Sequence, residues 1–239
     1  MSVEENIFMA RVAEQAERFD DMVDFLRPVL QEKGAEINGD ERNLLSVAFK
    51  NLISSKRTAL RTITAIEQNP KYTQFGGQLA AYKKKLEDAL YKDCDNIINL
   101  VKTKVLQNGR TTQDEPRAFF VKLIGDYYRY IAEAATGDRF ETVKQEALKA
   151  YSEANGITLP PCNPIRLGLA LNFSVFYYEV MKDQKKACEL ADSSLQAALD
   201  KIDELGEEEF RVAKSIIELL KENLSLWREE DGNNNIEDL

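Results

Sequence analysis

The chain has 239 residues, of which 44% are hydrophobic and 31% are charged, as in ordinary globular proteins. Its net charge of −9 argues against the overall basic surface of a nucleic-acid-binding protein. Because the sequence has no histidine, and its three cysteines lack CxxC spacing, it also excludes Ser-His-Asp and Cys-His catalysis and the common zinc motifs.

Apolar residues recur with the period of an α-helix along nearly the whole chain. The first stripe consists of Phe8, Val12, Ala16 and Phe19, at i, i+4, i+8 and i+11. The same period, with Gly, Pro and Asn as breaks, predicts eight further helices at 20–33, 41–68, 78–107, 117–135, 138–155, 165–181, 185–204 and 207–229. Residues 1–229 are therefore expected to form a single helical domain, followed by an acidic, disordered tail at 230–239.

Two of these helices are preceded by a side chain that suits an N-cap. Asp40 stands directly before the helix predicted from residue 41. Asn163 is followed by Pro164, which suits the first position of a helix because its missing N–H is not needed there. These two positions predict where the third and seventh helices begin.

Three cations share one face of the helix predicted at 41–68. Lys50, Arg57 and Arg61 lie at i, i+7 and i+11, which at 100° per residue places them within roughly 40° of arc. A stripe of solvated surface charge has the same spacing, and most charged helix faces have no other role. Taken alone, this pattern favours surface charge over a ligand site.

A second charged face lies among aromatic residues in the helix predicted at 117–135. It consists of Lys122, Asp126, Arg129 and Tyr130, at i, i+4, i+7 and i+8. An arginine in such surroundings needs anionic partners, because an unpaired, desolvated guanidinium is costly. An internal ion pair with Asp126 would satisfy Arg129, and so would a bound phosphate. This segment leaves the two interpretations equally open.

Two later helices carry apolar stripes that contain isolated amides. One stripe comprises Gly168, Asn172, Val175 and Glu179, and the other comprises Ile216, Leu219, Asn223, Leu226 and Trp227. A core stripe would explain the apolar members, but a buried asparagine needs hydrogen-bond partners. Asn172 and Asn223 could each donate to a carbonyl and accept from an N–H of an extended peptide. The two kinds of face together predict an amphipathic peptide groove.

Four segments resemble the 14-3-3 protein family. Residues 42–51 read RNLLSVAFKN, with Phe49 where the family usually has Tyr. Residues 125–130 read GDYYRY, residues 164–179 read PIRLGLALNFSVFYYE, and residues 13–18 read AEQAER. Matches of this length in this order are far more specific than a short motif. The resemblance covers nearly the whole chain.

The resemblance implies an all-α fold of nine antiparallel helices, which form a cup-shaped protomer with an amphipathic groove. It also implies dimerisation through the N-terminal helices, within residues 1–90, as a homodimer or as a heterodimer with a paralogue. The implied function is that of an adaptor without enzymatic activity or cofactor. Its ligands are phosphoserine or phosphothreonine peptides of client proteins, with Arg upstream of the phosphorylated residue and often Pro at the second position after it. Binding regulates the activity, localisation or assembly of the clients.

The resemblance further assigns roles to individual residues of this sequence. Those implied to bind the phosphate are Lys50, Arg57, Arg129 and Tyr130. Those implied to line the groove or hold the peptide backbone are Lys122, Leu171, Asn172, Val175, Glu179, Ile216, Leu219, Asn223, Leu226 and Trp227. Those implied to form the dimer interface are Val12, Ala16, Arg18, Asp21, Ala59, Tyr82 and Lys85, with Asp21 and Lys85 paired across the dimer. No residue is assigned to a metal.

The sequence departs from the family pattern at several positions. Ala89 stands where the family has an acidic partner for Arg18, although one exposed ion pair is worth only about 0–1 kcal/mol. Ala59 replaces a serine that many relatives phosphorylate, and Leu60 replaces a usual tryptophan. The segment from Arg211 to Trp227 is the most altered part. These changes concern dimer strength and ligand preference rather than the phosphate site.

Two other functions are compatible with a helical chain. A tetratricopeptide-like scaffold would need a 34-residue repeat, which the sequence does not show. In an α-helical enzyme, Asp126 and Glu179 would be the candidate acids, but they have a simpler role in positioning basic residues, and the pattern provides no activated nucleophile. The N-terminus has neither a basic n-region nor an apolar h-region, so a cytoplasmic protein without membrane or nucleic-acid partners is expected.

Overall fold

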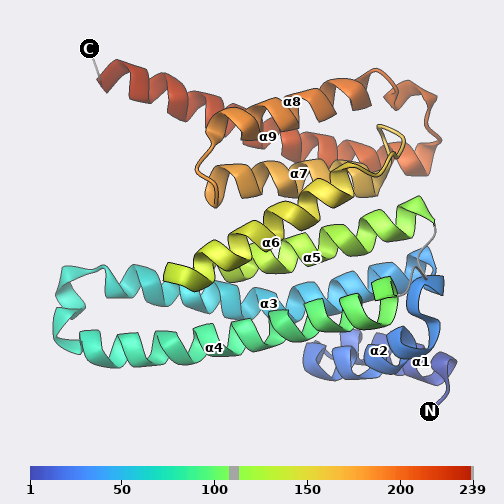
Figure 1. Ribbon diagram of the computed structural model, residues 1–239, viewed down its shortest axis with the longest axis horizontal. Helices are drawn as coiled ribbons and strands as arrows, with labels where there is room; N and C mark the ends of the chain where they lie inside the picture. Colours follow the sequence, from blue (N-terminus) through green and yellow to red (C-terminus); the bar gives the residue numbers. More distant parts are fainter. Residues whose placement is uncertain (108–112, 238–239) are drawn as a thin grey trace. The chain divides into compact units, whose positions relative to one another are not determined.

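The computed structural model describes residues 1–107 and 113–237, and every regular element in these two stretches is a helix (Figure 1). Nine α-helices, α1 to α9, are joined by loops and by short 3-10 or π segments, and no strand occurs among the described residues. The all-α prediction is therefore confirmed. The chain divides into two compact units, Met1–Thr112 with Ala134–Phe140, and Gln113–Glu133 with Glu141–Leu239. The single domain predicted for 1–229 stays a prediction.

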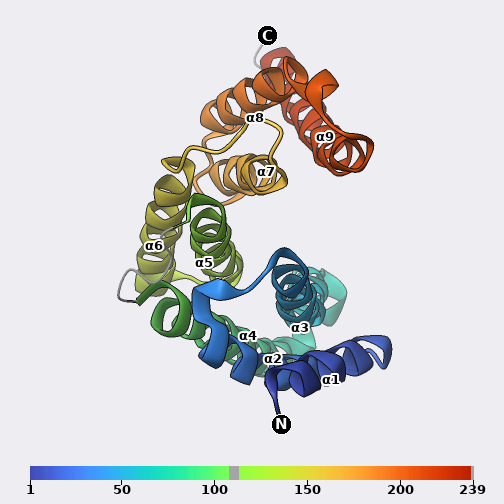
Figure 2. The same cartoon turned by 90° about the vertical axis from the view of Figure 1, so that its right-hand side faces the viewer.

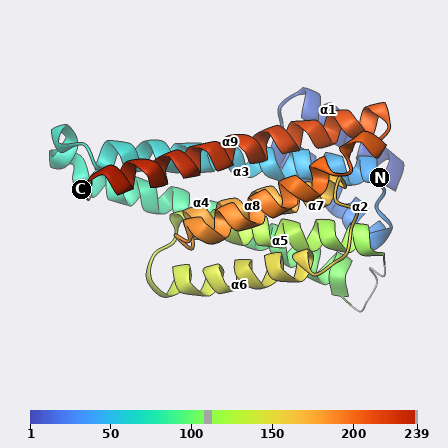
Figure 3. The same ribbon diagram turned by 90° about the horizontal axis from the view of Figure 1, so that it is seen from above.

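The first unit is built from four helices. They are α1 (Val3–Gln15), α2 (Phe19–Lys33), α3 (Gly39–Glu67) and α4 (Gly76–Val101). Each packs on the next along the chain. The two longest, α3 and α4, lie side by side and antiparallel, and the 3-10 segment Pro70–Phe75 makes their turn (Figures 1 and 3). Successive helices pair in this way because their connections are short.

Burial in the first unit follows the helical period. On α3 the buried side chains include Leu45, Phe49 and Ile53, which are four residues apart, and on α4 they include Leu90 and Cys94. Full burial of one large aliphatic or aromatic side chain contributes about 1.5–3 kcal/mol. Packing of these stripes therefore stabilises the α3–α4 pair and leaves the other faces of α3 to polar side chains.

The second unit contains α5 (Asp114–Ala134), most of α6 (Gly137–Asn155), α7 (Pro164–Glu179), α8 (Gln184–Leu199) and α9 (Glu207–Glu237). Helices α7, α8 and α9 form an antiparallel cluster, which Figure 2 shows nearly end-on. Their buried cluster includes Leu167, Ala191, Leu195, Leu220 and Leu224. Small residues on α8 allow close approach of the neighbouring helices.

The helix starts confirm one predicted cap and correct another. Asn163 caps α7, with its side chain accepting from the backbone N–H of Ile165 at 2.9 Å. The cap of α3 is Asn38 and not the predicted Asp40, because Asn38 and Glu41 form a reciprocal capping box. A capping box satisfies two backbone donors at once, whereas a single Asp side chain satisfies one. The helix therefore begins two residues earlier than predicted.

Two helix ends also differ from the predictions. In the helix predicted to reach residue 107, the α-helical part ends at Val101, and a π-helix follows over Lys102–Leu106. In this π-helix the Thr103 hydroxyl donates to the carbonyl of Asn99 at 2.7 Å. Hydrogen bonds of this kind, from a side chain to a backbone carbonyl, compete with the regular backbone hydrogen bonds of an α-helix. At the other end of the chain, α9 continues to Glu237, so the backbone of most of the predicted disordered tail is helical. No proline stops this helix, and each added residue of a formed helix gains a backbone bond.

None of the described helices combines the length and the apolar character needed to cross a bilayer. The segment between the helices predicted at 78–107 and 117–135 lies partly outside the described residues, and residues 114–116 already belong to α5. Proline at position 116 is compatible with this start, because the first turn of a helix needs no N–H partner there.

Candidate functional site

The second unit carries a network of charged and polar side chains on α5. Lys122 and Asp126 are one turn apart, and the Lys122 ammonium lies 2.7 Å from Oδ2 of the carboxylate. Asp126 is 7% exposed, and the Lys122 side chain is half-buried. A pair with this little solvent is sensitive to the loss of either partner, because the remaining charge would be desolvated without compensation.

Arg129 lies one turn further along the same helix and is 6% exposed. Its Nη1 donates to Glu133 at 2.9 Å, and its guanidinium carbon lies 4.7 Å from the ring centroid of Tyr130. Its carboxylate partner is therefore Glu133, whereas the internal pair with Asp126, one of the two interpretations left open by the sequence, does not form directly. The cation–π contact with Tyr130 adds a further attraction. Two of the groups that hold the guanidinium thus lie on its own helix.

Tyr151 of α6 connects Asp126 to Arg129. Its hydroxyl donates to Oδ1 of Asp126 at 2.7 Å and accepts from Nε of Arg129 at 3.2 Å. The Tyr151 ring is fully buried, and it stacks on Phe173 of α7 with 5.1 Å between the centroids. Asp126 and Arg129 therefore interact through a tyrosine that lies 22 residues after Arg129 in the sequence.

Asn172 of α7 joins the same network. Its Nδ2 donates to Oδ1 of Asp126 at 2.8 Å, so this carboxylate oxygen receives two hydrogen bonds. The sequence suggested that Asn172 would need a peptide to satisfy it. The structure gives its amide nitrogen an internal partner, which leaves the carbonyl oxygen of the amide as the group that an N–H donor could use.

Burial and the charge of Asp126 act in the same direction on the pKa of Tyr151, whereas burial and neighbouring groups act in opposite directions on the pKa of Arg129. Burial raises the pKa of Tyr151 well above its usual value, and the neighbouring Asp126 raises it further, so the hydroxyl keeps its proton. Burial alone would lower the pKa of Arg129, but the oxygens of Tyr151 and Tyr130 and nearby carboxylates raise it well above the usual value. The site therefore presents a permanent cation.

The first unit carries the other predicted phosphate ligands on α3. Lys50 is exposed, Arg57 is half-buried, and Arg61 is exposed. The arginines Arg57 and Arg61 each interact with other groups of the chain. The next lysine along, Lys56, is 2.7 Å from Asp93 on α4 and so belongs to the packed side of the helix. That Lys50 and Arg57 bind a phosphate stays a prediction.

The predicted groove residues of α7 and α9 differ in exposure. Leu171, Val175 and Ile216 are partly buried and pack against the α7–α9 core, and Asn223 is also half-buried. Leu219 and Leu226 are 47% and 58% exposed. Exposed leucines seven residues apart make an apolar strip on one face of α9. This strip is the most exposed apolar part of the predicted wall.

Two further predicted groove residues differ in burial, and their role in a groove stays a prediction. Trp227 is 5% exposed, and its ring stacks on Tyr178 with 4.9 Å between centroids, so it belongs to the core. Its backbone carbonyl accepts a hydrogen bond from the side chain of Gln184. Glu179 is exposed at the end of α7. Aromatic bulk drives Trp227 inward, because burying such a ring removes a large apolar area from water.

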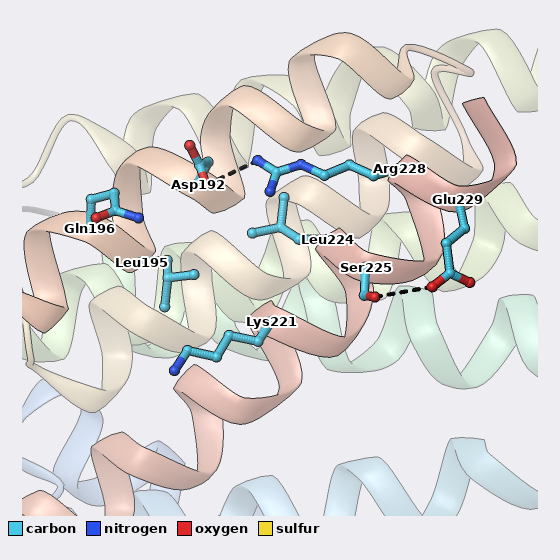
Figure 4. Close-up of a pocket in the computed structure, with 8 residues that line it drawn as sticks. All are labelled: Asp192, Leu195, Gln196, Lys221, Leu224, Ser225, Arg228 and Glu229. Atoms are coloured by element: carbon cyan, nitrogen blue, oxygen red, sulfur yellow. Dashed lines mark hydrogen bonds and ion pairs between the residues drawn. The ribbon is translucent and has the colours of Figure 1, made fainter. Parts of the chain in front are cut away.

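A separate pocket of about 450 Å³ lies between α8 and α9 (Figure 4). Its lining residues are Asp192, Leu195, Gln196, Lys221, Leu224, Ser225, Arg228 and Glu229. On α9 these positions are centred roughly half a turn from Leu219 and Leu226. Arg228 already pairs with Asp192 at 3.1 Å, and Ser225 donates to Glu229 at 3.4 Å. With two acids and two bases, the pocket favours neither sign of ligand charge.

The predicted dimer residues lie on the surface of the first unit. Val12, Ala16, Arg18, Tyr82 and Lys85 are exposed, and Asp21 and Ala59 are half-buried. Asp21 accepts from Nε of Arg18 at 2.8 Å within the chain. This ion pair holds the pKa of Asp21 below its usual range, because the hydrogen bond from Arg18 favours the charged carboxylate. The pairing of Asp21 with Lys85 across a dimer stays a prediction.

Sequence reasoning missed two members of the network on α5. Glu133 could have been found, because it lies four residues after Arg129 and oppositely charged residues at this spacing meet on a helix. Tyr151 gave no comparable signal, since nothing local relates it to α5. Within the described ranges, no three Cys, Asp or Glu side chains gather in a way that could hold a metal ion.

Comparison with known proteins finds relatives along most of the chain. The sequence model of the 14-3-3 protein family matches residues 9–228. The chain is 42% identical to 14-3-3 protein 3 of Entamoeba histolytica over 235 residues, which cover 95% of each chain. It is 42% identical to 14-3-3 protein beta/alpha of Gallus gallus, over 97% of this chain and 95% of the relative. It is 41% identical to a 14-3-3-like protein of Helianthus annuus, over 94% and 89%.

The described residues thus define an all-α protein with a buried, permanently charged arginine among tyrosines and carboxylates. The chain belongs to the 14-3-3 family. Phosphopeptide binding by non-enzymatic adaptors is typical of this family. The resemblance of the four sequence segments is confirmed over most of the chain.

Proposed function

We propose that the protein is a cytoplasmic, dimeric adaptor that binds phosphoserine or phosphothreonine segments of client proteins and so regulates their activity, localisation or assembly. The observation that supports this most is Arg129, which is buried, fully charged and held by Tyr130, Tyr151 and Glu133. A guanidinium in a fixed orientation suits the tetrahedral oxygens of a phosphate. Family membership supports the same role.

The proposed phosphate ligands are Lys50, Arg57, Arg129 and Tyr130. Two arginines and one lysine would make binding depend on the phosphate, since each charge-assisted contact contributes about 1.5–3 kcal/mol. Lys122, Asn172 and Asn223 would hold the peptide, and Leu219 and Leu226 would give it an apolar surface. We expect ligands with Arg upstream and Pro at the second position after the phosphorylated residue.

The test compares a labelled R-S-x-pS-x-P peptide with its unphosphorylated twin by fluorescence polarisation. We expect the phosphorylated peptide to bind at least tenfold more tightly, and Arg57→Ala or Arg129→Ala to weaken it about 10- to 100-fold. The control is Arg117→Ala, because Arg117 lies on the same helix as Arg129 but makes an exposed pair with Glu153 at 2.9 Å. Equal affinity of the wild type for the two peptides would exclude the proposal.

A helical scaffold for unphosphorylated peptides is the alternative that this experiment excludes. It predicts the same affinity for both peptides and no effect of salt beyond ordinary screening. The proposed adaptor predicts that rising salt weakens the phosphorylated peptide more than its twin. Light scattering on the wild type tests the dimer independently.

A further inference from the structure

We propose that Tyr151 is a positioning residue that fixes the orientation of Arg129 for phosphate, and that Gly125 sets the depth of its ring. This inference rests on the proposed function and deepens it. It concerns a residue that lies on α6, outside the segments that carry the predicted ligands. All the contacts that support it lie within the second unit.

The ring of Tyr151 has little freedom to move. A Cβ on Gly125 of α5 would lie 2.8 Å from Cδ1 and 2.9 Å from Cε1 of the ring, so only a glycine admits it at this depth. On another side it stacks on Phe173, and Phe176 lies 5.5 Å away between centroids. Packing on several sides holds an aromatic ring in one rotamer. The position of the Tyr151 hydroxyl is therefore fixed by α5 and α7 together.

The hydroxyl uses this fixed position for two hydrogen bonds. It donates to Asp126 Oδ1 at 2.7 Å and accepts from Arg129 Nε at 3.2 Å. Burial raises the pKa of Tyr151 far enough that the hydroxyl keeps its proton, so the direction of both bonds is fixed. With Nε bonded to Tyr151 and Nη1 bonded to Glu133, the guanidinium plane is held at two points. Its remaining N–H groups are then available to a phosphate in a set orientation.

The same hydroxyl also connects to the groups proposed to hold the peptide. Asp126 Oδ1 receives the Tyr151 hydroxyl and the Asn172 amide, and Oδ2 receives Lys122. Removal of the Tyr151 hydroxyl would leave Asp126 with one donor fewer and Arg129 Nε without its acceptor. A charged group that loses a hydrogen bond in a buried place either moves or stays uncompensated. Either result weakens the phosphate site without removing any ligand-contacting atom.

The variant that tests this is Tyr151→Phe, measured with the phosphorylated peptide and its unphosphorylated twin. We expect about tenfold weaker binding of the phosphorylated peptide and less than twofold change for the twin. In an Arg129→Ala background, Tyr151→Phe should cause less than twofold further loss, because Tyr151 acts through Arg129. The control is Tyr177→Phe, since Tyr177 stacks on the same Phe173 at 4.8 Å and lies outside the proposed site.

Several outcomes would overturn the positioning role. If the wild type prefers the phosphorylated peptide and Tyr151→Phe binds that peptide with unchanged affinity, the positioning role is overturned and the proposed function is not. An equal loss in the wild-type and Arg129→Ala backgrounds would show a merely structural effect. If Tyr151→Phe does not fold, Gly125→Ala retains the hydroxyl but displaces the ring, and an unchanged phosphopeptide affinity would overturn the inference. A wild type that binds both peptides equally would instead remove the proposed function.

Discussion

A Cβ on Gly125 would lie only 2.8 Å from Cδ1 of Tyr151, so the absence of a side chain on α5 determines how closely α6 approaches it. Because the obstructing atoms belong to a ring held on several sides, they cannot move aside cheaply. We expect Gly125→Ala to lower the free energy of unfolding by about 1–3 kcal/mol, as overpacking in cores does. Urea denaturation measures this difference.

The matched control for this substitution is Gly77→Ala on α4. A Cβ at Gly77 would meet nothing within 4 Å. Alanine there should be neutral or should stabilise by up to about 1 kcal/mol, because it reduces the freedom of the unfolded chain. Equal effects of the two substitutions would mean that the contact between Gly125 and Tyr151 is not tight.

Asp126 should be more important for stability than an exposed acid. Asp126→Asn replaces a carboxylate oxygen facing the Lys122 ammonium at 2.7 Å by a group that cannot neutralise it. We expect a loss of about 2–4 kcal/mol, because a poorly solvated pair is broken on one side. Chemical denaturation of Asp192→Asn is the comparison. Its partner Arg228 is 60% exposed, so the loss there should be about 0–1 kcal/mol.

The surface of α1 and α4 should be the dimer interface. Phe8 is 65% exposed, Val12 43% and Tyr82 54%, which is apolar area that one chain leaves in water. We expect Val12→Glu to convert the protein to monomer at micromolar concentration in light scattering, since a charge placed in such an interface is desolvated. Phe75→Glu changes another apolar residue that is 49% exposed and should leave the dimer intact. A dimer that survives Val12→Glu would contradict the assignment.

Tyr91 should make folding stability depend on alkaline pH. Burial, together with the charge of Glu87, raises the pKa of Tyr91 to about 12, whereas the pKa of a tyrosine in the unfolded chain is about 10. Below the lower value both states hold the proton, and between the two values only the folded state does. Stability should therefore fall as pH rises through this window. Urea midpoints at several pH values should fall less steeply for Tyr91→Phe than for wild type, whereas Tyr82→Phe should follow the wild type.

The sequence determined the elements of this protein and the side chains that meet on one helix. The helical period located the starts of α2 to α9 to within three residues, because burial of one face repeats every 3.6 residues, whereas several helix ends were missed by more. Spacing also identified Lys122 and Asp126 as neighbours and could have identified Glu133 as the partner of Arg129. The long segments of family resemblance then indicated the class of ligand.

Only the tertiary structure decided which helices share their polar groups. Asn172 and Asp126 are 46 residues apart, and Tyr151 reaches α5 only because Gly125 lets its ring approach. Local spacing cannot predict such contacts, since they depend on the depth and angle at which two helices pack. For the same reason the buried position of Trp227 could not be read from its stripe. The packing of α5, α6 and α7 thus decided which residues should hold Arg129 in place, whereas the sequence alone identified Arg129 as a candidate ligand of the phosphate.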